Sequence, residues 1–267
     1  MGILDKVYAF IYLRGFRVWL TYRTNVVLTV ISWIIPVFTY FFVGTSLGNR
    51  IVTSIGVTNY TAFFVIGLAF QGYVSSIIST ISQRLRNEQL YGTIEYYVIA
   101  KTGVSGFLVY SAVWGFTLNS LSAVVILTVG YLLGVRYAIN WIATILLVVV
   151  LMASTLGISM MAGAVTMITK QGNPVSIFFS TFTSLIAGTL FPISVLPLAV
   201  RYISYVIPLT WGLLGLRETM LANASLSQVL PYIERLSLLA IVYIIIGVSS
   251  YSYAFKLARK RGTLAEY

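Results

Sequence analysis

Long stretches without a charged residue alternate along the chain with short polar segments. Six of these stretches are long enough to cross a membrane as helices, because about 20 apolar residues span the hydrocarbon core. The alternation of apolar and polar residues that a membrane β-barrel requires is weak in all of them. The pattern therefore predicts an all-α polytopic membrane protein with six transmembrane helices, at residues 25–47, 61–83, 104–134, 141–169, 174–198 and 236–255.

Residues 1–24, which precede the first span, carry an amphipathic pattern. Lys6, Arg14 and Arg17 share one face of a helix. The apolar residues of the segment cluster on another face: Leu4, Val7, Ile11 and Val18. This pattern predicts an interfacial helix with its cations toward anionic lipid headgroups, and a polar leader is the alternative. No small-residue cleavage site follows, so we expect the first span to remain in the mature protein.

A different pattern precedes the last span, between Arg201 and Arg217. Only 15 uncharged residues separate these two arginines, and Pro208 and Gly212 interrupt them, which is too short and too broken for an ordinary span. We therefore expect residues 199–231 to form a re-entrant or extracytoplasmic hairpin. Proline-broken backbone at membrane depth needs cover from protein or water, so the hairpin should pack inside the bundle or line a vestibule. A plain extracytoplasmic loop is the alternative.

Lysine and arginine are distributed unevenly between the two sides of the predicted spans. Twelve lie on the side that holds both termini, and five lie on the other side. Cytoplasmic loops carry an excess of these residues, so the count predicts that both termini are cytoplasmic. The net charge of +11 is explained by these helix flanks, and we expect no nucleic-acid partner.

Composition narrows the chemistry that the chain can perform. Hydrophobic residues make up 59% of it and charged residues 9%, which is too apolar for a soluble domain of this length. Cysteine and histidine are absent, which removes thiolate nucleophiles, the commonest general base and the commonest metal ligand. No predicted span contains Asp, Glu, Lys or Arg, which disfavours proton-driven transport and intramembrane catalysis. We expect no metal, no cofactor and no catalytic activity.

The sequence also contains no G-x-x-x-x-G-K-[ST] loop, so the chain cannot hydrolyse ATP through a P-loop. If transport is active, its energy must come from another chain. An ATP-independent channel or carrier, and a structural membrane protein without transport, remain alternatives.

The predicted cytoplasmic segment 84–103 adds two carboxylates to an otherwise basic side. Glu88 and Glu95 are seven residues apart and share one face if the second span continues as a helix, although Gly92 can end that helix. One interpretation of these carboxylates is that Glu88 forms an ordinary solvated ion pair with Arg84, four residues earlier. The other interpretation is that the carboxylates are a docking site for a partner protein.

The order of these features along the chain resembles that in the permease subunits of type-2 ABC exporters. Those subunits have an interfacial helix and six spans, with an acidic motif after the second span and a proline-rich hairpin before the last span. The first motif, Glu-x-x-x-Gly-Thr-x-Glu, is matched by Glu88, Gly92, Thr93 and Glu95. The hairpin is matched by Gly188, Phe191, Pro192, Pro197, Pro208, Leu209, Thr210, Arg217 and Glu218.

The resemblance implies a permease of the cell membrane that dimerises with itself or with a second permease, and that pairs with cytoplasmic ATP-binding-cassette ATPases. ATP would be bound by those partner subunits. Segment 84–103 would be the coupling segment, and the residues assigned to it are Arg84, Glu88, Gly92, Thr93 and Glu95. The implied activity is export of a hydrophobic or amphiphilic compound, such as a drug or a lipid, and export of a polysaccharide or glycolipid is the alternative.

Overall fold

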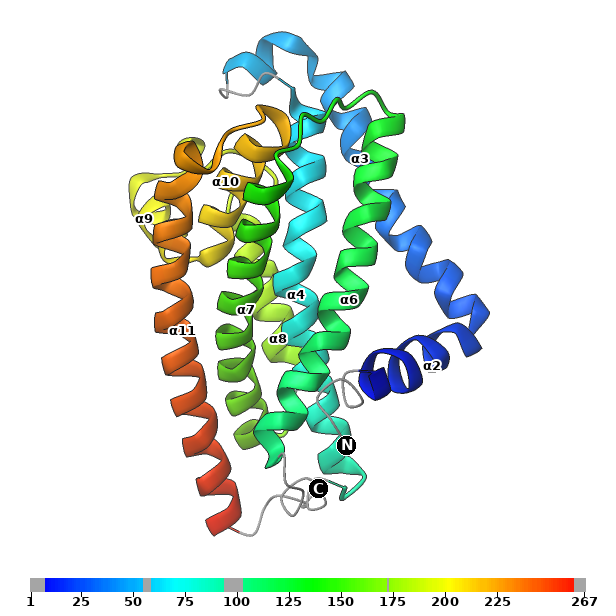
Figure 1. The fold of residues 1–267 in the computed structure, drawn as a ribbon, viewed down its shortest axis with the longest axis vertical. Coiled ribbons are helices and arrows are strands. Elements are labelled where there is room, and N and C mark those ends of the chain that lie inside the picture. Colours follow the sequence, from blue (N-terminus) through cyan, green and yellow to red (C-terminus); the bar gives the residue numbers. More distant parts are fainter. Residues whose placement is uncertain (1–7, 55–58, 94–102, 172, 262–267) are drawn as a thin grey trace.

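The computed structural model describes residues 8–54, 59–93, 103–171 and 173–261, and every regular element in these ranges is a helix. A short π-helical element and a short helix come first, followed by long helices that form a bundle (Figure 1). The elements are η1 (Ala9–Phe16), α2 (Arg17–Thr21), α3 (Arg23–Ser54), α4 (Tyr60–Leu90), α6 (Gly103–Leu132), α7 (Trp141–Thr169), α8 (Asn173–Ile186), η2 (Ile193–Val195), α9 (Leu198–Val206), α10 (Pro208–Leu221) and α11 (Leu226–Lys260).

Five of the described helices, α3, α4, α6, α7 and α11, are long and apolar enough to cross a membrane. Helices α9 and α10 meet at an angle of 86°, and only the two together are long and apolar enough to cross a membrane. If this bent pair is one span, the described residues contain six spans. The prediction of an all-α polytopic membrane protein is confirmed.

The fifth predicted span, residues 174–198, is wrong in its length. Helix α8 ends at Ile186, and the chain turns at Gly188, whose φ is +81°. Glycine adopts this left-handed conformation without a steric penalty, so the turn forms in the middle of an apolar run. The uncharged stretch therefore contains a short helix and a loop rather than one continuous span.

The last span and the hairpin also differ from the prediction. Helix α11 begins at Leu226, ten residues before the predicted start at Leu236, and includes Glu234 and Arg235. A capping box fixes this start, because the side chain of Ser225 and that of Gln228 bond reciprocally to the backbone. The predicted hairpin, residues 199–231, is two helices that end at Leu221, and its last residues belong to α11.

Helix α4 is the centre of the bundle. In the most apolar stretch of 18 residues of α4, 67% is buried inside the structure, whereas in the corresponding stretch of α3 only 6% is buried. It packs against α6, α7, α8 and α10, whereas α3 leans away from the bundle (Figure 1). Polar contacts join α4 to α6 in the interior, where the Tyr73 and Ser120 hydroxyls lie 2.8 Å apart and Asn119 donates to Ser76. Such interhelical hydrogen bonds are typical of membrane bundles.

Helices α7 and α11 cross at two glycines. A Cβ atom on Gly157 would lie 2.5 Å from the carbonyl oxygen of Tyr243, and a Cβ atom on Gly247 would lie 3.0 Å from the carbonyl carbon of Gly157. The two backbones are therefore in direct contact. Small residues at a helix crossing allow this approach, and the resulting dispersion contacts hold helices together in lipid.

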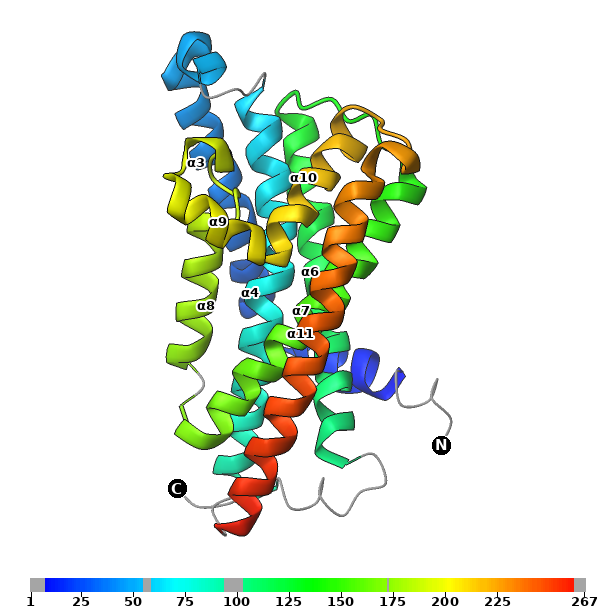
Figure 2. The same cartoon turned by 90° about the vertical axis from the view of Figure 1, so that its left-hand side faces the viewer.

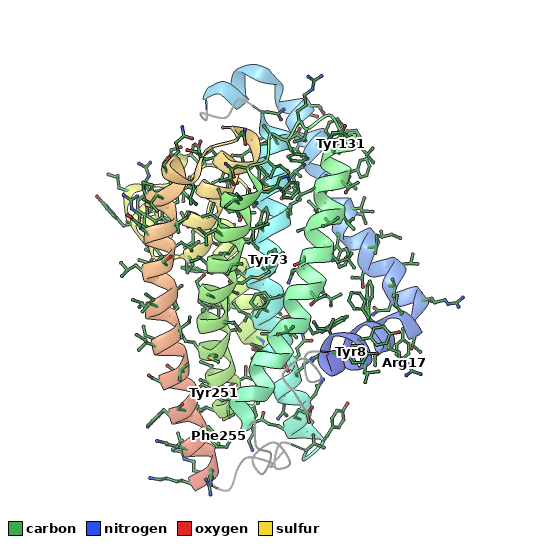
Figure 3. All side chains as sticks on the ribbon, viewed as in Figure 1. Tyr8, Arg17, Tyr73, Tyr131, Tyr251 and Phe255 are labelled. Atoms are coloured by element: carbon green, nitrogen blue, oxygen red, sulfur yellow. The ribbon has the colours of Figure 1, made fainter. Side chains whose placement is uncertain are left out.

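The N-terminal element lies across the long axis of the bundle (Figures 1 and 3). Gly15 and Phe16 on η1 dock against Trp114 of α6, with the Phe16 and Trp114 rings edge to face at 5.2 Å. Arg17 is exposed at the start of α2 (Figure 3). Residues 1–7, which include Leu4, Lys6 and Val7, lie outside the described residues.

Candidate functional site

Two regions that the sequence singles out lie at opposite ends of the bundle. The loop after α8, together with α9 and α10, lies at one end, and the C-terminal end of α4 lies at the other (Figures 1 and 2). Helix α4 reaches both of them, because Tyr60 and Gly67 near its start contact the loop and Glu88 in its last turn begins the acidic motif.

At the hairpin end, the guanidinium of Arg217 on α10 binds three backbone carbonyl groups. Its Nη2 atom lies 2.8 Å from the oxygen of Gly188, 3.5 Å from that of Thr189 and 3.2 Å from that of Phe63. Nε donates to the Phe63 oxygen as well, at 3.3 Å. The same guanidinium stacks on the Phe63 ring, 3.4 Å from its centroid, which adds a cation–π contact. Arg217 thus joins α10, α4 and the loop after α8.

A glycine of α4 makes room for this contact. A Cβ atom on Gly67 would lie 2.5 Å from the carbonyl oxygen of Thr189 and 3.2 Å from Nη2 of Arg217. A methyl group at this position would therefore displace the loop or the guanidinium. Sequence reasoning missed both Gly67 and Phe63, because nothing in an apolar run marks the residues that a distant loop will approach.

A second arginine binds the rest of the proline-broken loop. Arg201 on α9 donates to the carbonyl oxygens of Ile193 and Leu196, both at 3.2 Å, and also to that of Ser194. Carbonyl groups in an irregular segment at membrane depth need such donors, because lipid supplies none. These contacts lie within the hairpin region itself, and the expectation that the hairpin packs inside the bundle or lines a vestibule stays a prediction.

The structure distributes the predicted hairpin residues over the loop and the two helices. Gly188 forms the turn, Phe191 and Pro192 are half-buried in the loop, and Pro197 precedes α9. Pro208 is the first residue of α10, a position where proline disturbs no helical hydrogen bond. Arg217 is one of the five lysine and arginine residues that the sequence count assigns to the outer side, and the structure places it within α10 and against α4.

A cavity of about 450 Å³ lies beside Arg217. Apolar side chains such as Phe63, Ile193 and Leu214 line it together with Arg217 and the exposed Glu218. Its wall therefore combines an apolar surface with one cation and one carboxylate.

At the opposite end, α4 continues past the predicted span end at Gln83 and stops at Leu90. The amide of Thr93 donates to the carbonyl oxygen of Glu88 at 3.0 Å, and the amide of Gly92 donates to that of Gln89 at 3.2 Å. Gly92 has a φ of +66°. This hydrogen-bond pattern with a left-handed glycine is a Schellman motif, which closes a helix C-terminus.

The acidic motif is therefore a helix end with defined geometry. The hydroxyl of Thr93 donates to the Glu88 carboxylate, so three motif residues, Glu88, Gly92 and Thr93, are held together. Arg84 lies one turn before Glu88, and both are half-exposed. Glu95 and the rest of the coupling segment up to residue 102 lie outside the described residues.

The end of α4 is also fixed to α7. Leu85 is fully buried, and the buried side chain of Gln89 donates from Nε2 to the carbonyl oxygen of Met167 at 3.5 Å. Met167 is in the last turn of α7. A displacement of the motif would therefore act on two helices of the bundle.

Comparison with known proteins gives one family. A family model for the ABC-2 type transporter matches residues 11–221, from η1 to the end of α10. A search of curated proteins gave no significant match. The matched region covers most of the chain and contains both the acidic motif of α4 and the arginine-bound hairpin. The chain belongs to the ABC-2 type transporter family.

Proposed function

We propose that this chain is the permease subunit of an ABC-2 exporter, with both termini in the cytoplasm of the cell. Two permease chains, identical or different, would form the pathway, and separate ATP-binding-cassette subunits would hydrolyse ATP. The family membership supports a transport role, and the lack of a P-loop in the sequence supports a separate ATPase. The orientation rests on the uneven distribution of lysine and arginine.

The observation that carries this proposal is the capped end of α4. A coupling element must have a fixed shape and a rigid connection to the pathway, since a flexible loop would absorb the motion of the ATPase. The Schellman motif and the Thr93–Glu88 contact give the fixed shape, and Leu85 and Gln89 give the connection. In this proposal Arg84, Glu88, Gly92 and Thr93 face the ATPase.

Helix α4 would transmit the motion to the hairpin. From Glu88 back to Gly67 the helix is continuous, which corresponds to about 30 Å at about 1.5 Å per residue. At Gly67 and Phe63 it meets Arg217 and the loop after α8. A shift of α4 along or about its axis would therefore change the contacts of that loop.

The cavity beside Arg217 supports a hydrophobic or amphiphilic substrate. A compound with an apolar body and a polar end would find apolar side chains and the Arg217–Glu218 pair of charges in one space of about 450 Å³. This volume is in the range of small-molecule sites. We propose that it is the outer part of the export path.

Purification from the native membrane tests the function. The full chain, tagged at its C-terminus, should retain a stoichiometric ATP-binding-cassette protein, and the eluate should hydrolyse ATP. Glu88→Lys should release the ATPase, whereas Glu234→Lys, at an exposed position near the start of α11, should not. A chain that purifies alone in several mild detergents would favour an autonomous channel or carrier instead.

A further inference from the structure

One face of α10 forms a wall of the cavity beside Arg217. The residues of α10 that line it recur every three or four positions, which places them on one side of the helix. They include Thr210, Leu214, Arg217, Glu218 and Leu221. From Thr210 to Leu221 this face is about 16 Å long, at about 1.5 Å per residue. The cavity therefore follows α10 for several turns, with an apolar side chain between two polar ones.

Thr210 brings to this wall a hydroxyl group that no protein group binds. The residue is fully buried, and its Oγ1 atom has no hydrogen-bond partner among the described residues. A buried hydroxyl group without a partner is unfavourable, and most such groups in proteins are paired. A molecule in the cavity that accepts a hydrogen bond from Thr210 would remove this cost.

The charge of Arg217 has no counter-ion in the part of the chain that the structure describes. Its Nε and Nη2 atoms donate to the neutral carbonyl groups of Phe63, Gly188 and Thr189. No ion pair joins its guanidinium to a carboxylate of the described residues. The side chain is half-buried, and a charge in such a place is screened less than one at the surface. An anion in the cavity would therefore be attracted to Arg217.

The other polar side chains of the lining are mostly hydrogen-bond donors. Ser194 has a hydroxyl group, and the side-chain oxygen of Asn59 already accepts from the amide of Ala62 at 3.0 Å, which leaves the Asn59 NH2 group to donate. Among the described residues Glu218 is the one carboxylate that lines the cavity, and it is exposed. Water and salt screen an exposed charge. The half-buried Arg217 therefore dominates the field inside the cavity.

We infer that the exported compound carries an anionic group with several acceptor oxygens, and that Arg217 and Thr210 bind this group in the cavity. The inference rests on the proposed function, in which the cavity is part of the export path. Side chains of a helix lean toward its N-terminus, which brings the end of the long Arg217 side chain toward Thr210. The apolar body of the compound lies against Phe63, Ile193 and Leu214.

An amphiphile with a cationic end fits the cavity less well. Arg217 would repel it, and the exposed Glu218 would be its one charged partner among the described lining residues. A neutral amphiphile would fill the apolar part but would leave the charge of Arg217 without a counter-ion.

The test uses the purified full chain in phosphatidylcholine nanodiscs, without the ATPase. Scintillation proximity measures the binding of tritiated decyl phosphate, and unlabelled decanoate, decylamine and decanol compete with it. We expect decanoate to displace the probe, and decylamine and decanol to leave it bound. Displacement by decylamine as strong as that by decanoate would overturn the proposal, and so would the absence of saturable decyl phosphate binding. A chain that binds the probe but purifies without an ATPase would instead refute the proposed export function and leave the anion site in place.

Thr210→Val tests the site without disturbing the contacts of Arg217. It removes a hydroxyl group that has no partner among the described residues, so we expect an unfolding midpoint no lower than that of the wild type. Binding of decyl phosphate should weaken about tenfold, as for the loss of one hydrogen bond to a charged group. Thr144→Val on α7 is the matched control, because its Oγ1 atom is also buried without a partner among the described residues but Thr144 does not line the cavity. Equal binding by the two variants would overturn the proposal.

Glu218→Gln tests the sign of the charge that the cavity prefers. Removal of this carboxylate reduces the repulsion of an anion, so decyl phosphate should bind about threefold more tightly. A compound held through a cationic group would lose affinity in the same variant. Weaker binding of decyl phosphate by Glu218→Gln would overturn the proposal.

Discussion

Arg217 on α10 donates twice to the carbonyl oxygen of Phe63 on α4, from Nε at 3.3 Å and from Nη2 at 3.2 Å, and also stacks on the ring of the same residue. One side chain thus binds both the backbone and the side chain of a single partner. The pair connects the hairpin to the central helix of the bundle. It also gives a reason for an arginine in this apolar setting, since a planar guanidinium can bind carbonyl groups in one plane and a ring with its face.

Replacing Arg217 by lysine tests the geometry of this contact. Lysine keeps the charge but cannot bind the carbonyl groups of Phe63 and Gly188 while stacking on the ring. We expect Arg217→Lys to destabilise the protein by about 2 kcal/mol, and Arg217→Gln by at least as much. Thermal unfolding in detergent measures the change. Wild-type stability in both variants would show that the contact contributes nothing.

Gly67 provides a second test of the same contact. Gly67→Ala places a methyl group 2.5 Å from the Thr189 oxygen, so the loop must move, and we expect a loss of about 1–3 kcal/mol. Gly115→Ala on α6 is the matched control, because its nearest neighbour is a flexible atom of Ile77 at 3.4 Å. Unfolding midpoints of the two variants should differ clearly. Equal midpoints would contradict the close approach.

The crossing of α7 and α11 predicts a similar difference within one helix. Gly157→Ala would push against the Tyr243 backbone, which cannot rotate away, so we expect lower stability and weaker packing of α11. Gly163→Ala, six residues further along α7, meets only the Ile81 side chain at 3.4 Å and Tyr251 at 3.8 Å. Thermal unfolding measures the stability of both variants. If Gly163→Ala is less stable than Gly157→Ala, the close backbone contact between α7 and α11 is refuted.

Gly92 permits a test of the α4 cap without a steric effect. No atom of the residues that the structure describes lies within 4 Å of a Cβ built on it, so we attribute the effect of Gly92→Ala to its φ of +66°. We expect about 1 kcal/mol of local strain, no change in the global unfolding midpoint, and weaker stimulation of the partner ATPase. Gly92→Asn should be milder, because asparagine tolerates this conformation better. If alanine and asparagine behave like wild type, the cap is not needed for coupling.

Counting uncharged residues located most of the spans but not the breaks within apolar sequence. It placed α3, α4, α6 and α7 correctly to within a turn or two at most ends, because their apolar runs are bounded by charged or polar residues. It failed after Ile186, where the composition stays apolar while the backbone turns at Gly188. It also started α11 too late, because Glu234 and Arg235 are charged residues inside a helix.

Only part of the candidate site could be predicted from the sequence. The acidic motif was found from local spacing, and its Gly92 does end the helix, because a Schellman motif depends on residues adjacent in sequence. The partners of Arg217 could not be found in this way. Phe63 lies 154 positions away in sequence, and only the fold brings it to the guanidinium.

The claim that α4 couples the ATPase end to the hairpin can be tested by a distance measurement across the bundle. The chain contains no cysteine, so Tyr91→Cys and Tyr202→Cys introduce two unique labelling sites, at residues that are 75% and 70% exposed. Spin labels on these sites, measured by double electron–electron resonance in the complex with its ATPase, report the separation of the two ends. We predict that the distance distribution shifts when ATP is trapped with vanadate, and that Glu88→Lys abolishes the shift. A distribution that is unchanged by ATP, or that shifts equally in the Glu88→Lys complex, would contradict the account.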